Sequence, residues 1–118
     1  MKIHEYQAKR ILAEHGVRIP RGEVASSPDE VREIAKQFGG TVVVKAQVHA
    51  GGRGKAGGIK VARDPETAFS AASAIIGMEI KGRRVNTVLV EEGIDIQKEI
   101  YLGVLFDRAK KSHTLICS

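Results

Sequence analysis

Residues 41–63 read TVVVKAQVHAGGRGKAGGIKVAR, a glycine-rich run between two apolar stretches. Five of the chain's 13 glycines lie within residues 49–58, together with Arg53 and Lys55. Glycine accepts a positive φ and lets backbone N–H groups approach a ligand, while cationic side chains supply the charge that a polyphosphate needs. The stretch therefore predicts a strand carrying Lys45, a glycine-rich hairpin that handles phosphate, and a second strand.

The spacing of this run excludes one glycine motif and argues against another. A Walker A loop requires G-x-x-x-x-G-K-[ST], but His49 stands six residues before Lys55 and Ala56 follows it. Residues 52–57 satisfy G-x-G-x-x-G, yet a dinucleotide-binding fingerprint opens a helix. Residues 59–63 instead alternate apolar and basic side chains, which indicates a half-buried strand. A flexible hairpin without a ligand is the alternative.

The composition favours one small layered domain. The chain has 118 residues, 42% of them hydrophobic, with three Phe, two Tyr and no Trp. The core must therefore consist mainly of Val, Ile, Leu and Ala, which suits packed helices and a sheet. The net charge of +5 favours an anionic partner. We expect a small phosphorylated ligand and no nucleic acid, because the charge is spread along the chain and stacking aromatic residues are few.

The single cysteine and the apolar runs bear on location. Cys117 stands alone, which excludes a disulfide framework and is expected to leave it as a small core residue. A reducing cytoplasm is the simplest setting. No apolar run approaches the roughly 20 residues that span a bilayer, and no export signal is seen. The sequence thus predicts a cytoplasmic protein with no membrane contact.

The order of helix and strand signals predicts an α+β fold. Ser27-Pro28 and Asp64-Pro65 are the helix starts, and Glu30 is placed to complete a capping box with Ser27. The expected elements are a helix over 4–15, a strand over 23–25, a helix from 27 to 38, strands over 41–45 and 59–63, a helix over 64–76, a strand over 86–92 and a hairpin of 99–107 with 112–117. The basic residues 81–84 are expected to form a solvated turn.

Three motifs carry a family resemblance: HEYQAK at 4–9, VKAQVHAGGRGKAGG at 44–58 and KEIYLG at 98–103. They resemble the amino-terminal part of the beta subunits of succinate–CoA ligases (succinyl-CoA synthetases), which are ATP-grasp proteins. The resemblance covers essentially all 118 residues.

The resemblance implies a fold and a division of the chain. The fold is an ATP-grasp small lobe with a mixed or antiparallel sheet, helices on one side and a glycine-rich hairpin. Residues 21–92 would form this nucleotide-binding lobe. Residues 1–20 would be a helix and connector belonging to a second lobe, and residues 93–118 the start of that lobe, which we expect to be truncated.

The resemblance also implies nucleotide-binding residues and no catalytic residue on this chain. They are Lys45, Gly52, Arg53 and Gly54 at the phosphates, Glu91 at the hinge, Ile94 with its backbone at the base, and Glu99 at the ribose hydroxyls. A carboxylate suits two vicinal hydroxyls, and a lysine held on a strand suits phosphate. From residue type alone, Glu91 and Glu99 are typical of solvated surface carboxylates.

The activity implied by the resemblance is thioester formation. Succinate, CoA and ATP would give succinyl-CoA reversibly, through an acyl phosphate and a phosphohistidine on an alpha subunit. The magnesium ligands would lie beyond Ser118, so we expect no activity from this chain alone. A malate–CoA ligase is a close alternative. An alternative of a different class is a non-catalytic module that binds anions or nucleic acid. A kinase lobe is disfavoured because Lys45 precedes the glycine loop.

Two smaller expectations concern nucleotide choice and the histidines. Pro20 has no side-chain amide to read guanine, and guanine-preferring relatives carry a polar residue there, which favours ATP. His49 is disfavoured as a phosphorylated nucleophile because no acidic partner is adjacent. The other histidines, His4, His15 and His113, are expected to cap, pack or face solvent, since no second metal ligand stands at a suitable spacing.

Overall fold

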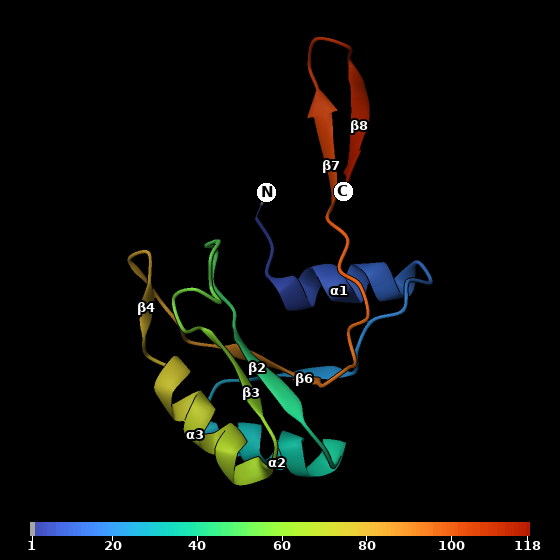
Figure 1. Ribbon diagram of the computed structural model, residues 1–118. Coiled ribbons are helices and arrows are strands. Elements are labelled where there is room, and N and C mark those ends of the chain that lie inside the picture. Colours follow the sequence, from blue (N-terminus) through green and yellow to red (C-terminus); the bar gives the residue numbers. More distant parts are fainter. Residues whose placement is uncertain (1) are drawn as a thin grey trace.

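The computed structural model describes residues 2–118 and has an antiparallel sheet at its centre (Figure 1). The helices are α1 (Glu5–Glu14), α2 (Pro28–Phe38) and α3 (Pro65–Ile75). The strands are β1 (Gly22–Ala25), β2 (Val42–Ala46), β3 (Ile59–Ala62), β4 (Glu79–Ile80), β5 (Arg83–Arg84), β6 (Val88–Glu92), β7 (Leu102–Asp107) and β8 (Ser112–Cys117). The α+β class predicted from the sequence is confirmed.

Local capping sets the starts of α2 and α3, as predicted. The Ser27 hydroxyl accepts a hydrogen bond from the Glu30 amide at 3.3 Å, and the Asp64 carboxylate accepts one from the Thr67 amide at 2.7 Å. Each cap is followed by a proline, whose missing N–H costs nothing in the first turn. The predicted capping box differs in detail, because the Glu30 carboxylate accepts from the amide of Ser26 instead of Ser27.

Four strands in the order β1-β6-β2-β3 form the main sheet, and every pairing is antiparallel. Side chains alternate between its faces. Val42, Val44 and Ala46 are buried toward α2 and α3, while Val43 and Lys45 point to the opposite face. The prediction of helices on one side holds for α2 and α3, whereas α1 lies across that opposite face (Figure 1).

The core between the sheet and its two helices is aliphatic, as the composition predicted. Its fully buried larger side chains are Val31, Val42, Val44, Ile75, Ile80, Val85, Val88 and Val90. Each contributes about 1.5 to 3 kcal/mol through removal from water. Small alanines on α3 let that helix approach the sheet closely.

The strand after the glycine run shows which face of the sheet is left open. The alternation of residues 59–63 predicted a half-buried strand. Its buried member is Ala62, which belongs to the core, and Val61 remains 65% exposed on the α1 side of the sheet. Apolar surface is therefore available at the sheet's open face.

A short hairpin, β4–β5, occupies part of the expected solvated turn. Lys81 and Gly82 form its two-residue connection with φ values of 51° and 76°, which is typical of a type I′ turn. Both residues are exposed, as predicted. The strand pairing around them was not predicted, because two residues per strand are too few to show a periodicity.

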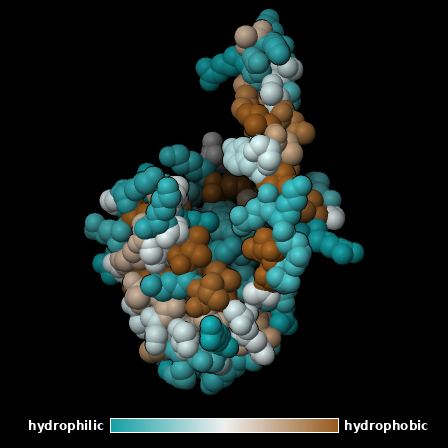
Figure 2. Space-filling model, viewed as in Figure 1, coloured by the Kyte–Doolittle hydropathy of each residue, from teal (hydrophilic) through white to brown (hydrophobic). Residues whose placement is uncertain are grey.

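The β7–β8 hairpin projects from the body, in agreement with its prediction (Figures 1 and 2). Apolar side chains are exposed on both of its faces: Leu102, Val104, Leu105, Phe106, Leu115 and Ile116. The expectation that Cys117 is a core residue is wrong, since the thiol is exposed on β8. Nothing within residues 2–118 covers this hairpin. No helix in the described part of the chain has the length and apolar character needed to cross a membrane.

Candidate functional site

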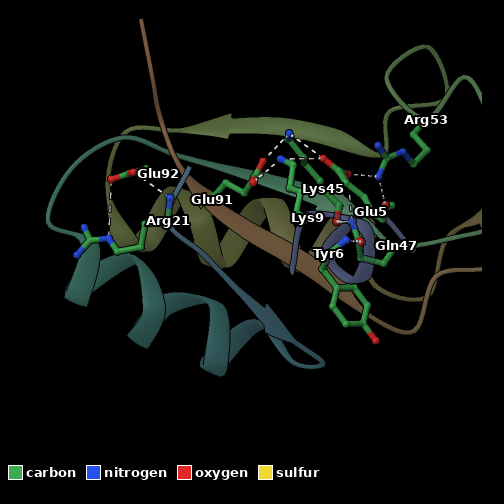
Figure 3. A network of polar contacts seen from close by, with 10 residues as sticks. Glu5, Tyr6, Lys9, Arg21, Lys45, Gln47, Arg53, Glu91 and Glu92 are labelled. Carbon is green, nitrogen blue, oxygen red and sulfur yellow. Dashed lines mark hydrogen bonds and ion pairs between the residues drawn. The ribbon is translucent and has the colours of Figure 1, made fainter. Parts of the chain in front are cut away.

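Lys45 lies at the centre of a cluster of charges on the open face of the sheet (Figure 3). Its Nζ is 2.6 Å from Glu91 Oε1 and 3.2 Å from Glu5 Oε1. Lys9 contacts both carboxylates as well. We call Glu5, Lys9, Lys45, Arg53 and Glu91 the charged cluster. It joins α1, β2, β6 and the glycine loop.

Strand register explains why Lys45 and Glu91 meet. Lys45 pairs with Leu89, and Val43 pairs with Glu91. The two charged residues are therefore diagonal neighbours on one face, within reach of long side chains. Glu91 is only 3% exposed because α1 covers it, and the two ammonium groups beside it offset the cost of removing a carboxylate from water.

We define the glycine loop as residues 51–58. Arg53 connects this loop to β2 and α1. Its guanidinium donates to the Ala46 carbonyl at 2.8 Å and lies 2.7 Å from Glu5 Oε2. Its own carbonyl accepts from the Gly58 amide at 2.8 Å. Arg53 is thus bound through both backbone and side chain at the end of the β2–β3 ladder.

The backbone of the glycine loop leaves a run of donors free. Within residues 2–118, the N–H groups of Gly51, Gly52, Arg53, Gly54 and Lys55 donate to no protein acceptor. Gly52 has a φ of +75°, a conformation that disfavours larger residues. Successive free amides in such a turn form an anion-binding concavity.

Open space lies beside these donors. A hollow of about 370 Å³ is lined by residues that include Glu5, Gln47, His49, Gly51 and Arg53. A smaller hollow of about 50 Å³ under α1 has Tyr6, Lys9, Pro20 and Glu91 in its wall. The residue used to predict the base preference, Pro20, therefore lies on the same side of the sheet as Lys45.

Lys81 also reaches the glycine loop, although its turn is exposed. Its Nζ is 3.8 Å from the position that a Cβ on Gly52 would occupy. No carboxylate in residues 2–118 forms an ion pair with it. The sequence predicted that this ammonium faces solvent, whereas in the structure it lies beside Gly52 of the glycine loop.

The charged cluster shifts two protonation equilibria. Burial acts to raise the pKa of the Glu5 carboxyl, but the hydrogen bond from Arg53 and the charge of Lys45 outweigh it and lower the pKa to about 2. Burial opposes the charge of Lys45, yet its contacts with Glu91 and Glu5 raise its pKa above 10.5. Both groups are therefore ionised at neutral pH.

The remaining predicted residues, Ile94 and Glu99, lie in the segment between β6 and β7. Ile94 is 58% exposed, and the side chain of Glu99 forms no hydrogen bond or ion pair with residues 2–118. The structure thus brings together Lys45, Arg53, Glu91 and the glycine loop, but it does not bring Ile94 and Glu99 into contact with them. Their roles at the base and ribose stay predictions.

The histidines follow the expectation of capping and packing. His15 Nδ1 lies 2.8 Å from the Ile11 carbonyl, and His113 packs edge-on against Phe106. His4 stacks on His49 with ring centroids 4.0 Å apart, and burial together with the neighbouring His49 lowers the pKa of His4. Among residues 2–118 no three His, Cys, Asp or Glu side chains converge as a metal site.

Sequence reasoning missed the contribution of α1. Glu5 and Lys9 stand four residues apart, a spacing that places them on one helix face and could have marked a charged face. Gln47 also lies at this contact, where its Oε1 accepts from the Tyr6 amide at 3.2 Å. The position of α1 over the sheet had no signal in the sequence pattern.

An ATP-grasp domain model matches residues 2–118, and the chain belongs to that family. Among solved structures, a Pyrococcus horikoshii protein superposes on this chain with a TM-score of 0.85 and is 25% identical in sequence. The match covers 98% of this chain and 51% of the Pyrococcus chain. A dinucleotide-forming acetyl-coenzyme A synthetase of Ca. Korarchaeum cryptofilum shares the fold, with a TM-score of 0.87 at 22% identity over 98% and 52% of the two chains.

The curated relatives confirm the narrower resemblance to succinate–CoA ligase beta subunits. The GDP-forming beta subunit of Thermus thermophilus is 57% identical, and the ADP-forming one of Herpetosiphon aurantiacus is 58% identical, each over 118 residues and the whole of this chain. The chain spans 31% of the length of each relative.

Proposed function

We propose that this chain is the phosphate-grasping part of the beta subunit of a succinate–CoA ligase. The observation that carries the proposal is a run of five free backbone N–H groups in a loop whose Gly51 and Arg53 line an open hollow. Lys45 contacts the same Glu5 carboxylate as Arg53, and Lys81 lies beside Gly52. Phosphate oxygens accept hydrogen bonds from such donors, and the cations offset their charge.

Each group has a distinct part in binding the nucleotide. The amides of the glycine loop orient the phosphate oxygens, and Arg53 adds a planar donor at the base of the loop. Lys45 supplies a positive charge from a fixed strand position, and Lys81 supplies another from a turn. Donors and charges fixed before the reaction stabilise the charge that develops on a transferred phosphoryl group.

The full reaction is proposed from the relatives. Succinate, CoA and ATP would yield succinyl-CoA, with an acyl phosphate and a phosphohistidine on an alpha subunit as intermediates. Magnesium, when bound, neutralises phosphate charge. The two acidic members of the charged cluster, Glu5 and Glu91, already contact ammonium and guanidinium groups. We therefore propose that the magnesium ligands lie in the part of the relatives' length that this chain does not span.

The finer assignments belong to the same proposal. Ile94 and Glu99 would meet the base and the ribose once the segment after β6 closes over the nucleotide. Residues 21–92 would act as one lobe, with residues 1–20 and 93–118 belonging to the facing lobe. We propose a cytoplasmic location, which suits the exposed free thiol of Cys117.

Nucleotide and acid choice remain separate proposals. The relatives include both GDP-forming and ADP-forming ligases at nearly equal identity, so identity does not decide the base. Pro20 beside the small hollow offers no amide donor or acceptor from its side chain, which favours adenine. Malate in place of succinate is the alternative acid, because no residue of this chain has been placed at the acid.

Binding measurements separate the ligase function from a module that binds anions or nucleic acid. We expect calorimetry to show ATP binding that falls only moderately as salt rises, and much weaker binding of an oligonucleotide of equal charge. A nucleic-acid groove would give the reverse order, with affinity falling steeply with salt. Stronger oligonucleotide binding would therefore contradict the proposal.

A further inference from the structure

The carboxylate of Glu5 contacts all three cations of the charged cluster. Its two oxygens lie 2.7 Å from Arg53, 3.2 Å from Lys45 and 3.2 Å from Lys9. The Gln47 amide adds a donor at 3.4 Å. Carboxylate and phosphate oxygens accept the same charge-assisted hydrogen bonds, so Glu5 and a phosphate compete for the same donors.

Helix α1, which carries Glu5, contributes no buried side chain to the core. None of its residues is buried, and Ile11 and Leu12 remain 49% and 47% exposed. Its contacts to the sheet are mainly polar, through Glu5, Lys9 and the Tyr6 amide (Figure 3). A helix without buried apolar side chains loses little apolar burial when its first turn moves away.

We propose that Glu5 holds Lys45 and Arg53 in the unliganded protein and releases them to the nucleotide phosphate, so that it sets the affinity of the site. The inference rests on the proposed function and adds a residue to it. The charged cluster contains two carboxylates and three cations. After Glu5 leaves, Glu91 still contacts Lys45 and Lys9, and the phosphate takes the place of Glu5 at Arg53.

Glu5→Gln tests this competition, with Glu14→Gln as its matched control. Glu14 ends the same helix, is exposed, and forms no ion pair within residues 2–118. Both variants remove one negative charge. We expect Glu5→Gln to bind ADP and inorganic tripolyphosphate roughly three- to tenfold more tightly than Glu14→Gln, and adenosine equally. Circular dichroism checks that both variants are folded.

The wild-type protein gives a second readout that does not depend on a substitution. The pKa of the Glu5 carboxyl is about 2 in the free protein, and we expect it to rise toward 4.5 when tripolyphosphate takes Arg53 and Lys45. The carboxyl ¹³C resonance, followed with and without saturating tripolyphosphate, measures this shift.

The outcomes separate this inference from the function on which it rests. If the wild-type protein binds neither ADP nor tripolyphosphate, both are overturned. If it binds them while the Glu5 resonance does not respond, or while Glu5→Gln binds no more tightly than Glu14→Gln, the inference is overturned and the proposed function stands.

Discussion

Lys45 on β2 and Glu91 on β6 are joined across two antiparallel strands by a contact of 2.6 Å, on the face of the sheet away from the core. Glu91 is almost inaccessible, whereas the side chain of Lys45 remains 21% exposed. The carboxylate therefore fixes an ammonium group that still has a free side. An ammonium group that is held in place and partly exposed is well suited to bind an anionic ligand.

The first prediction concerns Lys45. Lys45→Ala should weaken tripolyphosphate binding by about tenfold or more, because a hydrogen bond to a charged group contributes roughly 1.5 to 3 kcal/mol. Lys60→Ala is the control, since Lys60 lies exposed on neighbouring β3 and pairs with Val44, on the opposite side of the sheet from Lys45. Calorimetry at matched salt measures both, and equal losses would contradict the assignment.

Lys81→Ala should reduce the affinity for tripolyphosphate by an intermediate amount. Its ammonium lies beside Gly52, and no carboxylate within residues 2–118 pairs with it. It stands on an exposed turn, where solvent weakens its contribution. We expect roughly a threefold weakening of tripolyphosphate binding, smaller than that of Lys45→Ala and larger than that of Lys60→Ala. If Lys81→Ala and Lys60→Ala bound tripolyphosphate with the same affinity, Lys81 would have no role in phosphate binding.

Glu91→Gln should destabilise the fold by about 2 to 4 kcal/mol, because it leaves two ammonium groups beside a buried neutral amide. Glu92→Gln provides the comparison on the same strand. The side chain of Glu92 is 40% exposed, and its ion pair with the Arg21 guanidinium spans 3.8 Å. Its Oε1 also accepts from the Arg21 amide at 2.9 Å, a hydrogen bond that glutamine can keep, so the loss should stay below about 1 kcal/mol. Urea unfolding measures the difference, and similar midpoints for the two variants would argue against a structural role for Glu91.

Alanine substitutions at two glycines of the loop should affect stability and phosphate binding differently. A Cβ on Gly58 would come within 2.6 Å of the buried Ile80 and 3.2 Å of Ala46, so Gly58→Ala should cost about 1 to 3 kcal/mol in unfolding free energy. A Cβ on Gly54 would meet nothing closer than 4.0 Å. Gly54→Ala should therefore keep wild-type stability but bind tripolyphosphate more weakly. Loss of stability in Gly54→Ala would show a packing role instead.

The contribution of Glu5 to the free energy of unfolding should decrease as the pH falls. Its pKa in the folded chain is about 2, below the ordinary 4.5, so the unfolded chain takes up the proton first. The stabilisation is fully present above pH 4.5 and is lost as the pH falls toward 2. With allowance for partial solvent screening it amounts to about 1 to 3 kcal/mol. The unfolding free energies of wild type and Glu5→Gln should converge over that interval, and a constant difference would contradict it.

Elements whose signals are local could be predicted from the residues alone. Ser27 and Asp64 start helices because their side chains bond amides three residues ahead, and Gly39 ends α2 with a φ of +72°. The glycine-rich run between two apolar stretches was sufficient to predict the hairpin. Lys45 could be placed beside that hairpin, and the motifs around it were sufficient for the family. Each of these inferences needs only residues that are close in the chain.

The distant groups that meet could be identified only from the packed fold. Glu5 reaches Arg53 because α1 crosses the open face of the sheet, and Lys81 reaches Gly52 because β4–β5 turns back over the loop. The same packing exposes Val61 and leaves Cys117 uncovered on β8. These outcomes depend on strand register and on which face a helix covers. Such choices are set by the summed burial and charge of the whole chain, and no local pattern records them.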